Sequence, residues 1–309
     1  MSAHAAQVEH AFAAHRPFLW SLCYRLCGDA ADADDLVQET FVRALQHPPA
    51  RTDEPWRPWL VRVALNLGRD LLRRRRRRGY VGPWLPAPVE EPEAPAEAGP
   101  EARYDRLESV TVAFLLALEA LTPAQRAVLL LRDVFDYSVR EAARALEMSE
   151  PNVKTTHLRA RRRMQEYDRG RVRPGAALHG STREALARFL GCLQAGDTAG
   201  VEALLADDAA AISDGAGEFA GARRSVLGRA NVAAFFIGLT KKAGQTRSVA
   251  LRTFNGLPAV LIDVADGRTG WAPRVVMQCE LDERGLIRRV YASMATRKLV
   301  RVSATPAAR

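Results

Sequence analysis

The chain has 309 residues, of which 48% are hydrophobic and 26% charged, and its formal net charge is +9. This composition is typical of folded domains, and the length corresponds to two or three domains of roughly 100–200 residues each. The sequence contains no apolar run of about 18 residues and no basic stretch leading into an apolar core at its N-terminus, so we expect neither a membrane partner nor a secretory signal. The four scattered cysteines do not form a disulfide framework. We therefore expect a cytoplasmic protein that uses no cofactor.

An acidic, proline-rich segment divides the basic chain. Residues 81–102 carry five acidic and no basic side chains, and Gly79–Ala102 holds six of the 17 prolines. Proline fixes φ and lacks an amide donor, which predicts an extended linker over residues 80–102. The basic segments on either side of it favour a polyanionic partner. Tyr80, Trp84 and Leu85 are too apolar for a spacer that only spans, and they predict a docking contact.

Residues 1–79 predict three helices. Apolar residues at three- and four-residue spacing indicate a first helix that stops at Gly28, after which Asp29 can cap the second. The third helix runs from about Pro58 into six consecutive arginines, Arg73–Arg78. Cys23 and Cys27 lie one helical turn apart and could hold a metal, but a packed pair of small apolar side chains is the interpretation we favour, so we expect no metal site.

The arginine run lies on a helix that also carries aromatic residues. Trp56 and Trp59 come near its start and Asn66 near its middle. Bases stack on aromatic rings while basic side chains pair with phosphates, so this combination suits single-stranded DNA. The alternatives are a solvated charged face or a membrane or nuclear-targeting patch for the arginines, and a place in the core for Trp59.

The segment from Asp136 to Met164 predicts a helix-turn-helix. Ser138 caps one short helix, Ser149 caps a second, and only residues 147–149 separate them. Glycine is usual in such a turn, and Glu147 stands there instead. The second helix would fit the major groove, where asparagine, lysine and arginine can read bases. An ordinary helical hairpin with a solvated basic face is the alternative. His157 stays open as a buried polar group, a DNA contact or a surface residue.

Residues 178–303 predict a mixed domain. Helices are expected over Ser181–Ala195, Val201–Leu205 and Gly228–Leu239, and strands over Ser248–Phe254, Ala259–Val264, Arg274–Leu281 and Leu286–Ala292. Helices against one curved antiparallel sheet make an α+β cone with a pocket at its open end. Asp214 and Asp263 could act as bases there, with Trp271 and Cys279 as lining. Because Asp214 precedes Gly215, a turn is the interpretation we favour, and we expect no enzyme; a small ligand of this domain stays open.

Several motifs in a fixed order resemble a known family. The series DADDLVQETFVRAL, WRPWLVRVALNLGRDLLRRRRRR and LTPAQRAVLLLRDVFDYSVREAARALEMSEPNVK resembles the bacterial extracytoplasmic-function (ECF) sigma factors over roughly residues 8–168. The linker segment GPWLPAP, the SDGAG at Ser213–Gly217 and the C-terminal extension resemble the subgroup with a fused SnoaL-like domain. Ala87, Ala216 and the ATRKL at Ala295–Leu299 depart from that subgroup's usual motifs. The resemblance implies a multidomain chain, with two all-α sigma domains followed by an α+β SnoaL-like cone.

The resemblance also implies partners and roles. Members are subunits of RNA polymerase that recognise promoters, so core RNA polymerase and promoter DNA are the implied partners. Residues 1–79 would be sigma region 2, residues 103–171 sigma region 4, and residues 178–303 a regulatory domain acting in place of an anti-sigma factor. The implied residues are Asp35, Gln38, Glu39 and Phe41 for polymerase; Arg57, Trp59, Arg62, Asn66 and Arg73 for the minus-ten element; Asn152, Lys154, Thr155 and Arg159 for the minus-thirty-five element; and Trp84, Leu85, Asp214 and Gly215 for interdomain contact.

Two other classes of function compete with this interpretation. One is a SnoaL-like isomerase or hydrolase with a DNA-binding appendage, and the other is a helix-turn-helix regulator that acts without polymerase. The acidic helix Asp32–Leu45 favours the sigma factor over the regulator, because a lone repressor has no need of it.

Overall fold

The computed structural model describes residues 3–47, 55–90, 104–105, 107–171, 173–219, 221–242, 246–265 and 269–303. The chain divides into two compact units. The first combines Met1–Gly79 with Pro92–Val172, and the second combines Tyr80–Glu91 with Arg173–Arg309. The first part of the predicted linker thus belongs with the C-terminal domain, and its residues 91–102 lie outside the described residues. Among the described residues, no helix has the length and apolar character needed to cross a membrane.

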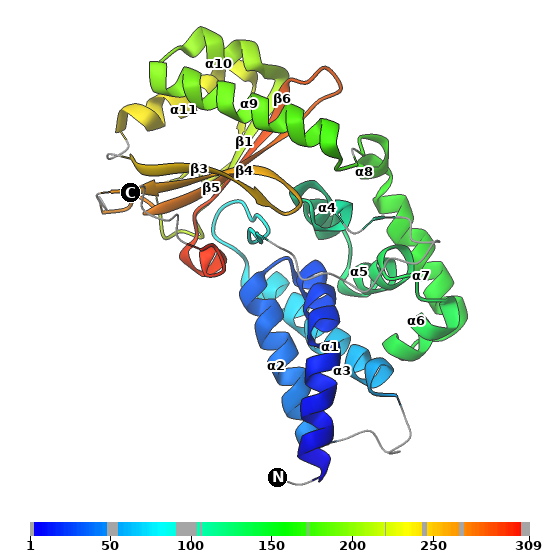
Figure 1. The fold of residues 1–309 in the computed structure, drawn as a ribbon. Coiled ribbons are helices and arrows are strands. Elements are labelled where there is room, and N and C mark those ends of the chain that lie inside the picture. The colour runs from blue at the N-terminus through cyan, green and yellow to red at the C-terminus, as the bar shows by residue number, and fades with distance from the viewer. Residues whose placement is uncertain are drawn as a thin grey trace. The chain divides into compact units, whose positions relative to one another are not determined.

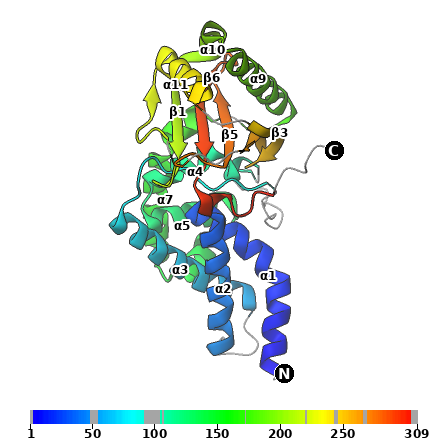
Figure 2. The ribbon, with the colours of Figure 1, turned by 90° about the vertical axis from the view of Figure 1, so that its left-hand side faces the viewer.

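Three long helices begin the first unit, as the sequence predicts. They are α1 (Ala3–Cys27), α2 (Ala30–Gln46) and α3 (Trp56–Arg78). α1 and α2 run side by side (Figures 1 and 2). Gly28 ends α1 with a positive φ of 68°, a backbone conformation that glycine adopts without strain. The Asp29 side chain then caps α2 by accepting a hydrogen bond from the Asp32 amide. Fully buried Trp20 and Leu60 lie in the core.

Short helices make up the rest of the first unit. In chain order they are η1 (Glu108–Val110), α4 (Val112–Ala117), η2 (Leu118–Ala120), α5 (Pro123–Leu129), η3 (Leu130–Val134), α6 (Val139–Leu146), α7 (Glu150–Arg163) and α8 (Gln165–Arg169). Thr122 and Ser138 each close a capping box, and Ser149 caps α7. α5, which Thr122 caps, runs directly into a π-helical turn at η3. α6 and α7 form the predicted helix-turn-helix.

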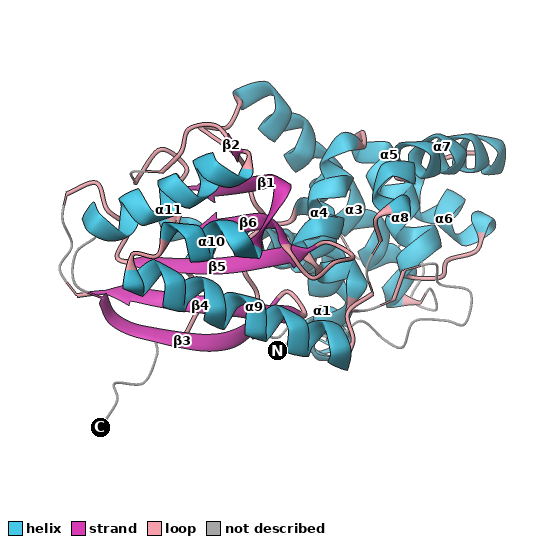
Figure 3. Ribbon diagram, turned by 90° about the horizontal axis from the view of Figure 1, so that it is seen from above, coloured by secondary structure: helices cyan, strands magenta, loops and turns pink. Residues whose placement is uncertain are grey.

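The second unit is the α+β domain. Its elements are α9 (Ala176–Ala195), α10 (Thr198–Leu204), β1 (Leu205–Asp214), β2 (Val226–Leu227), α11 (Arg229–Lys242), β3 (Thr246–Phe254), β4 (Leu257–Val264), β5 (Arg274–Leu281), β6 (Ile287–Ser293) and η4 (Thr296–Leu299). The six strands lie in the order β2-β1-β6-β5-β4-β3. α9, α10 and α11 cover one face of the sheet (Figure 3), where their apolar side chains form a core around Phe189 and Phe236.

The sheet differs from the expected one in two ways. β1 and β2 were not predicted, because the β1 sequence LADDAAAISD is rich in alanine and aspartate, which are poor strand formers, and β2 has only two residues. β1 also pairs with β6 in parallel, with Ile212 opposite Tyr291, so the expectation of an antiparallel sheet was wrong. Parallel neighbours need a long crossover, which the chain from β2 through β5 supplies. The consequence for function is that Asp214 lies at the end of a buried strand rather than in a turn.

Candidate functional sites

One face of α2 is exposed and partly acidic. Asp35, Gln38 and Glu39 are exposed and follow each other at helical spacing. Phe41 belongs to the other side of the helix, because it is 5% exposed and packs edge-on against Phe12 with 4.9 Å between ring centroids. Of the four residues expected to bind polymerase, three therefore share an exposed face, on which Glu39 pairs with Arg43 at 3.1 Å, and Phe41 lies beneath it.

Two apolar residues on this face escaped the sequence analysis. Val42 is 42% exposed and Leu45 is 49% exposed. Val42 follows Gln38 by four residues and Leu45 follows Val42 by three, so all three lie on one helical face. Only the exposure of the Leu45 side chain reveals it as a surface residue. The face of α2 can thus offer a partner both charge and apolar contact.

The residues expected to read the minus-ten element are spread along α3. Trp59 is 9% exposed, in agreement with the core alternative for this ring. The Arg57 guanidinium lies 4.0 Å from the Phe18 ring centroid, and its charge partly offsets the burial that raises the pKa of Tyr137, near the start of α6. Arg62 and Asn66 are half-buried. The structure thus leaves Arg62 and Asn66 partly accessible while it engages Arg57 and buries Trp59.

Arg73, the last of these residues, lies at the surface of α3. It is exposed and forms an ion pair with Asp70 at 2.8 Å. Exposed ion pairs contribute about 0–1 kcal/mol, so the Arg73 side chain can exchange Asp70 for another anion at little cost.

The outer face of α7 carries the four residues expected at the minus-thirty-five element. Asn152, Lys154, Thr155 and Arg159 are all exposed. The opposite face holds buried Val153, Ala160 and Met164 against the rest of the helix-turn-helix. An amphipathic recognition helix anchored in this way can present its polar side to a groove.

Two further residues of α7 lie beside these four: Leu158 is exposed with them, and His157 makes an internal contact. Leu158 is 53% exposed between Thr155 and Arg159, and sequence reasoning missed it. An exposed leucine there could contact a thymine methyl group. His157 is a part-buried polar group, because its Nε2 lies 2.8 Å from Asp133 Oδ1. Among the three alternatives for His157, the structure favours an internal contact that ties α7 to η3.

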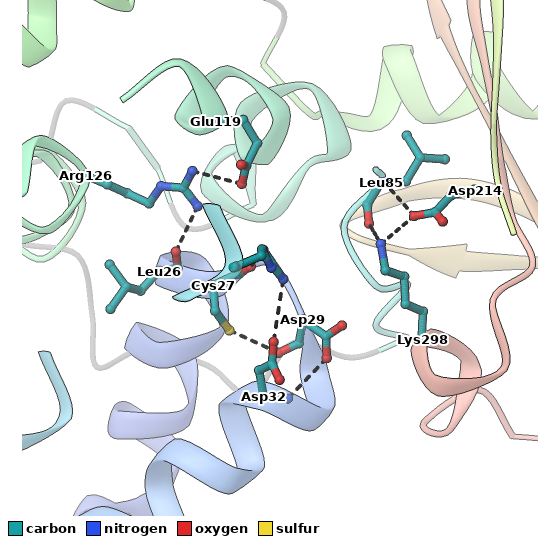
Figure 4. Close-up of polar contacts among 10 residues, drawn as sticks. Leu26, Cys27, Asp29, Asp32, Leu85, Glu119, Arg126, Asp214 and Lys298 are labelled. Carbon is teal, nitrogen blue, oxygen red and sulfur yellow. Dashed lines mark hydrogen bonds and ion pairs between the residues drawn. The ribbon is translucent and has the colours of Figure 1, made fainter. Parts of the chain in front are cut away.

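A buried ion pair holds the linker on the C-terminal domain (Figure 4). The Asp214 side chain is fully buried at the end of β1, and Lys298 of η4 is 4% exposed and donates to it. The Tyr80 hydroxyl and the Leu85 amide also donate to Asp214, each at 2.7 Å. Lys298 donates in addition to the Leu85 carbonyl. We call Tyr80, Trp84, Leu85, Asp214 and Lys298 the linker clasp.

Aromatic rings complete the linker clasp. The Lys298 ammonium lies 4.8 Å from the centroid of the Tyr80 ring and 4.6 Å from that of Trp84. A cation over aromatic faces gains about 0.5–2 kcal/mol, more when it is desolvated as here. Lys298 escaped the sequence analysis, although ATRKL had been noted as a departure from a family motif.

The linker continues along the domain beyond the clasp. Val89 and Asn255 exchange two hydrogen bonds, at 3.3 Å from the Val89 amide to the Asn255 side chain and at 2.8 Å from the Asn255 amide to the Val89 carbonyl. Gly217 has a φ of +79°, and a Cβ there would come within 3.0 Å of Val81. Gly215 is equally close-packed, since a Cβ would lie 3.1 Å from the Phe219 carbonyl. Glycines therefore allow the loop after β1 to approach the linker closely.

The two candidate bases are both engaged in ion pairs. Asp263 pairs with Arg274 at 2.6 Å and accepts a hydrogen bond from Ser248, while Asp214 belongs to the clasp. Cys279 is 4% exposed, and burial raises the pKa of its thiol to about 12. Neither carboxylate is thus positioned as a free base, and no cluster of metal-ligating side chains occurs within the described ranges.

A cavity of about 360 Å³ lies beside the clasp in the second unit. Linker residues Val81–Pro83 form one wall, and Ser213, Glu218 and Arg223 contribute polar groups to the others. Because the linker closes one side, any molecule that entered this cavity would touch it.

Comparisons with known proteins give the class and then the family. Residues 11–78 match the family described as sigma-70 region 2, and residues 111–164 match sigma-70, region 4, which together define a sigma factor. The chain is 33% identical over 286 residues to the ECF RNA polymerase sigma factor SigJ of Mycobacterium tuberculosis, with 85% of each chain covered. It is 35% identical over 216 residues to SigG of the same organism, with 60% of this chain and 56% of that one covered. The chain therefore belongs to the ECF RNA polymerase sigma factors.

A solved structure agrees with this assignment. The crystal structure of the Mycobacterium tuberculosis ECF sigma factor SigJ aligns with a TM-score of 0.71 at 26% identity, and the alignment covers 97% of this chain and 99% of that one. The expected fold class is confirmed: helical sigma domains precede an α+β domain with the SnoaL-like arrangement of helices on one sheet. The sigma factor class is one that initiates transcription rather than one that catalyses a reaction of its own.

Proposed function

We propose that this chain binds core RNA polymerase and directs it to promoters. The exposed face of α2 supports the first step, because Asp35, Gln38 and Glu39 project together from a helix whose other side is anchored in the core. α3 would take part in recognition of the minus-ten element, and α7 would read the minus-thirty-five element in the major groove.

Charge reversal tests the polymerase surface. Asp35→Lys combined with Glu39→Lys changes the sign of the exposed α2 face without touching a buried side chain. Co-elution with core RNA polymerase from a sizing column should be lost while the circular dichroism spectrum and unfolding midpoint stay within error of the parent. The matched control, Asp207→Lys with Asp208→Lys, carries the same charge change on exposed residues of β1. Unchanged co-elution of the α2 variant would contradict this surface.

We further infer that the C-terminal domain modulates the sigma factor in place of a separate anti-sigma factor. The observation that carries this proposal is the linker clasp, in which Asp214 and Lys298 hold residues Tyr80 and Leu85. The held segment connects the sequences of regions 2 and 4. A domain that binds or releases this segment changes the free length of chain between the two promoter-reading regions.

The clasp has the properties of a latch rather than of a loose contact. Removing one partner of a buried ion pair typically costs about 3–5 kcal/mol, because the other charge is left buried without compensation. Replacing both partners by apolar groups is often close to neutral. The pair therefore favours one arrangement of the linker strongly, and it can be removed by a double substitution without unfolding the domain.

The test uses the double variant Asp214→Asn, Lys298→Met in the full chain. Hydrogen exchange of the linker amides, Leu85 in particular, should become at least tenfold faster, and transcription with limiting core polymerase should change. Glu184→Gln with Lys241→Met, at an exposed glutamate of α9 and an exposed lysine of α11, is the control for loss of one charge of each sign. If exchange accelerates and transcription is unaltered at every polymerase concentration, the domain is not a regulator of this kind.

The cavity beside the clasp gives a small ligand a place to act. It lies between linker residues Val81–Pro83 and the loop after β1, so occupancy would bear directly on linker docking. Ligands found by a thermal-shift screen of the full chain should lose their effect in Arg223→Ala, and should slow the exchange of the Leu85 amide. Compounds that shift both proteins equally would not use this cavity.

A further inference from the structure

The six arginines that end α3 divide into two groups. Arg75 donates to the Cys27 carbonyl at 2.8 Å and lies 3.5 Å from Asp32, and Arg76 donates to the Leu121 carbonyl. Arg73 pairs with Asp70. Three of the six thus have partners within the first unit, and two of these, Arg75 and Arg76, help to hold the end of α3 in place.

The other three arginines do not help to hold the end of α3 in place. Arg74, Arg77 and Arg78 are exposed. None of their guanidinium groups makes an ion pair or a hydrogen bond with any residue in the described part of the chain. They lie at spacings of three and one along the helix, so they occupy one side of it. Like charges this close repel one another, and the helix dipole compensates only those in the last turn.

This cationic side continues the stripe expected to face promoter DNA. Arg62, Asn66, Arg73 and Arg77 follow one another at intervals of four, seven and four residues, which keeps them on one face of a helix. Buried Ala64 and Gly68 lie on the opposite face, so the stripe is held rigidly. From Asn66 to Arg77 the helix advances about 17 Å, which corresponds to about five base pairs of duplex.

We propose that Arg74, Arg77 and Arg78 form a phosphate-binding track for duplex DNA immediately upstream of the minus-ten element. This inference rests on the proposed role of α3 in minus-ten recognition. The C-terminal end of α3 leads into the linker and on to region 4, whose target lies upstream, so the track should extend in that direction. The recognised chemistry is the phosphate backbone, and base sequence is not read.

Salt dependence provides the measurement, because each neutralised phosphate adds about 0.9 to the slope of log K against log salt concentration. Holoenzyme assembled from the full chain and core RNA polymerase is titrated with two probes cut from a promoter selected with the same holoenzyme. Both carry the single-stranded minus-ten element. One ends there, and the other continues upstream as about ten base pairs of duplex.

The triple variant Arg74→Ala, Arg77→Ala, Arg78→Ala should lower the slope by about 2–3 on the long probe. On the short probe it should bind like the parent. Alanine is the best helix former, so α3 stays intact. The control with equal loss of charge, Arg183→Ala, Arg188→Ala, Arg284→Ala, should match the parent on both probes.

The outcomes separate the inference from the function it rests on. If the parent binds the short probe and the triple variant keeps the parent slope on the long one, the phosphate track is wrong. An equal loss of slope on both probes would also overturn it, since the arginines would then act at the minus-ten element itself. If Arg62→Ala and Asn66→Ala leave binding to the short probe unchanged, the proposed minus-ten role of α3 fails instead.

Discussion

A single residue, Glu147, departs from what the turn of a helix-turn-helix favours. Its backbone is left-handed, with φ 53° and ψ 46°, a conformation in which a side chain costs about 1–2 kcal/mol. Its carboxylate compensates in part through coulombic attraction to the Arg69 guanidinium, the pKa of which is lowered chiefly by burial. The glycine expected at this position is thus replaced at the expense of backbone strain.

Glu147→Gly should therefore stabilise the protein. Glycine removes the backbone strain of the folded state, but it also increases the conformational entropy of the unfolded chain, which favours unfolding. The first effect is larger, so the free energy of unfolding should rise by about 0.5–1 kcal/mol. Denaturant unfolding gives this value from the midpoint. Glu147→Gln keeps the strain and removes the charge, so it should be slightly destabilising. If glycine destabilises more than glutamine does, interaction with Arg69 outweighs the backbone.

The four cysteines should differ in reactivity. Burial raises the pKa of Cys23 and of Cys279 to about 12 and that of Cys27 well above its ordinary value, while Cys192 is half-buried. The thiolate is the reactive form. At pH 8 the native protein should lose only the Cys192 thiol to iodoacetamide within minutes, as peptide mass spectrometry would show. In denaturant all four should react. Rapid native labelling of Cys23 would contradict the burial of α1.

At the scale of elements, helix starts were the most predictable feature. Asp29, Ser138 and Ser149 were each expected to cap a helix, and each side chain accepts a backbone amide there. Caps are local chemistry between residues two or three positions apart, so a sequence reveals them. β1 escaped notice for the opposite reason: its alanines have little strand preference, and only pairing with β6, far along the chain, makes the segment a strand.

The capping box of α6 predicts a pH dependence. Hydrogen bonds from the side chain and the backbone of Ser138 lower the pKa of Glu141. A group whose pKa is lowered on folding contributes stability above its unfolded pKa of about 4.3 and loses that contribution as the pH falls through the folded value. Glu141→Gln should thus be destabilising by about 0.3–1 kcal/mol at pH 7. Chemical unfolding at a series of pH values should show this difference shrink below pH 4. A constant difference from pH 7 to pH 3 would mean that the charge of Glu141 plays no part.

For the proposed polymerase surface, the family motif identified the helix correctly but did not show which of its side chains are exposed. The family pattern grouped Asp35, Gln38, Glu39 and Phe41, yet Phe41 packs on Phe12. A family motif shows which residues recur at given positions. It does not separate the residues that contact a partner from those that pack beneath them in the core. Helical spacing and burial make that separation, and they add Val42 and Leu45 to the exposed face.

At the scale of the whole molecule, long-range contacts were the least predictable. The apolar residues Trp84 and Leu85 predicted that the linker docks, and the family resemblance implied Asp214 as an interdomain contact. Nothing in the sequence indicated that these residues contact Lys298, which lies more than 200 positions from Leu85. A buried lysine gives no local pattern. The unit boundaries follow from such contacts, so Tyr80–Glu91, the first part of a linker expected between the domains, was found within the second unit.

The first unit joins both sigma regions through buried arginines. Arg25 of α1 donates to the Ser109 hydroxyl at 2.9 Å, and Arg126 of α5 donates to the Leu26 carbonyl at 2.9 Å (Figure 4). The charge of Arg57 acts across the same junction, where it partly offsets the burial that raises the pKa of Tyr137. The two promoter elements, by contrast, are named for positions 25 base pairs apart, which is about 85 Å of duplex. This packed unit must therefore open before both elements can be bound together.

Opening can be followed by energy transfer between fluorophores at Glu9→Cys on α1 and Arg144→Cys on α6, in a Cys192→Ser background. Transfer should be high in the free chain and fall when core polymerase and promoter are added. Ser109→Ala removes the hydroxyl that accepts the hydrogen bond of Arg25, which is worth about 1.5–3 kcal/mol for a charged donor, so partial opening should then occur at roughly tenfold lower polymerase concentration. Tyr24→Phe, at a buried tyrosine of α1 that takes no part in this bond, controls for loss of a hydroxyl. Transfer that stays high in the complete promoter complex would mean that the two regions bind DNA without separating, and that the contacts of Arg25 and Arg126 survive in the active state.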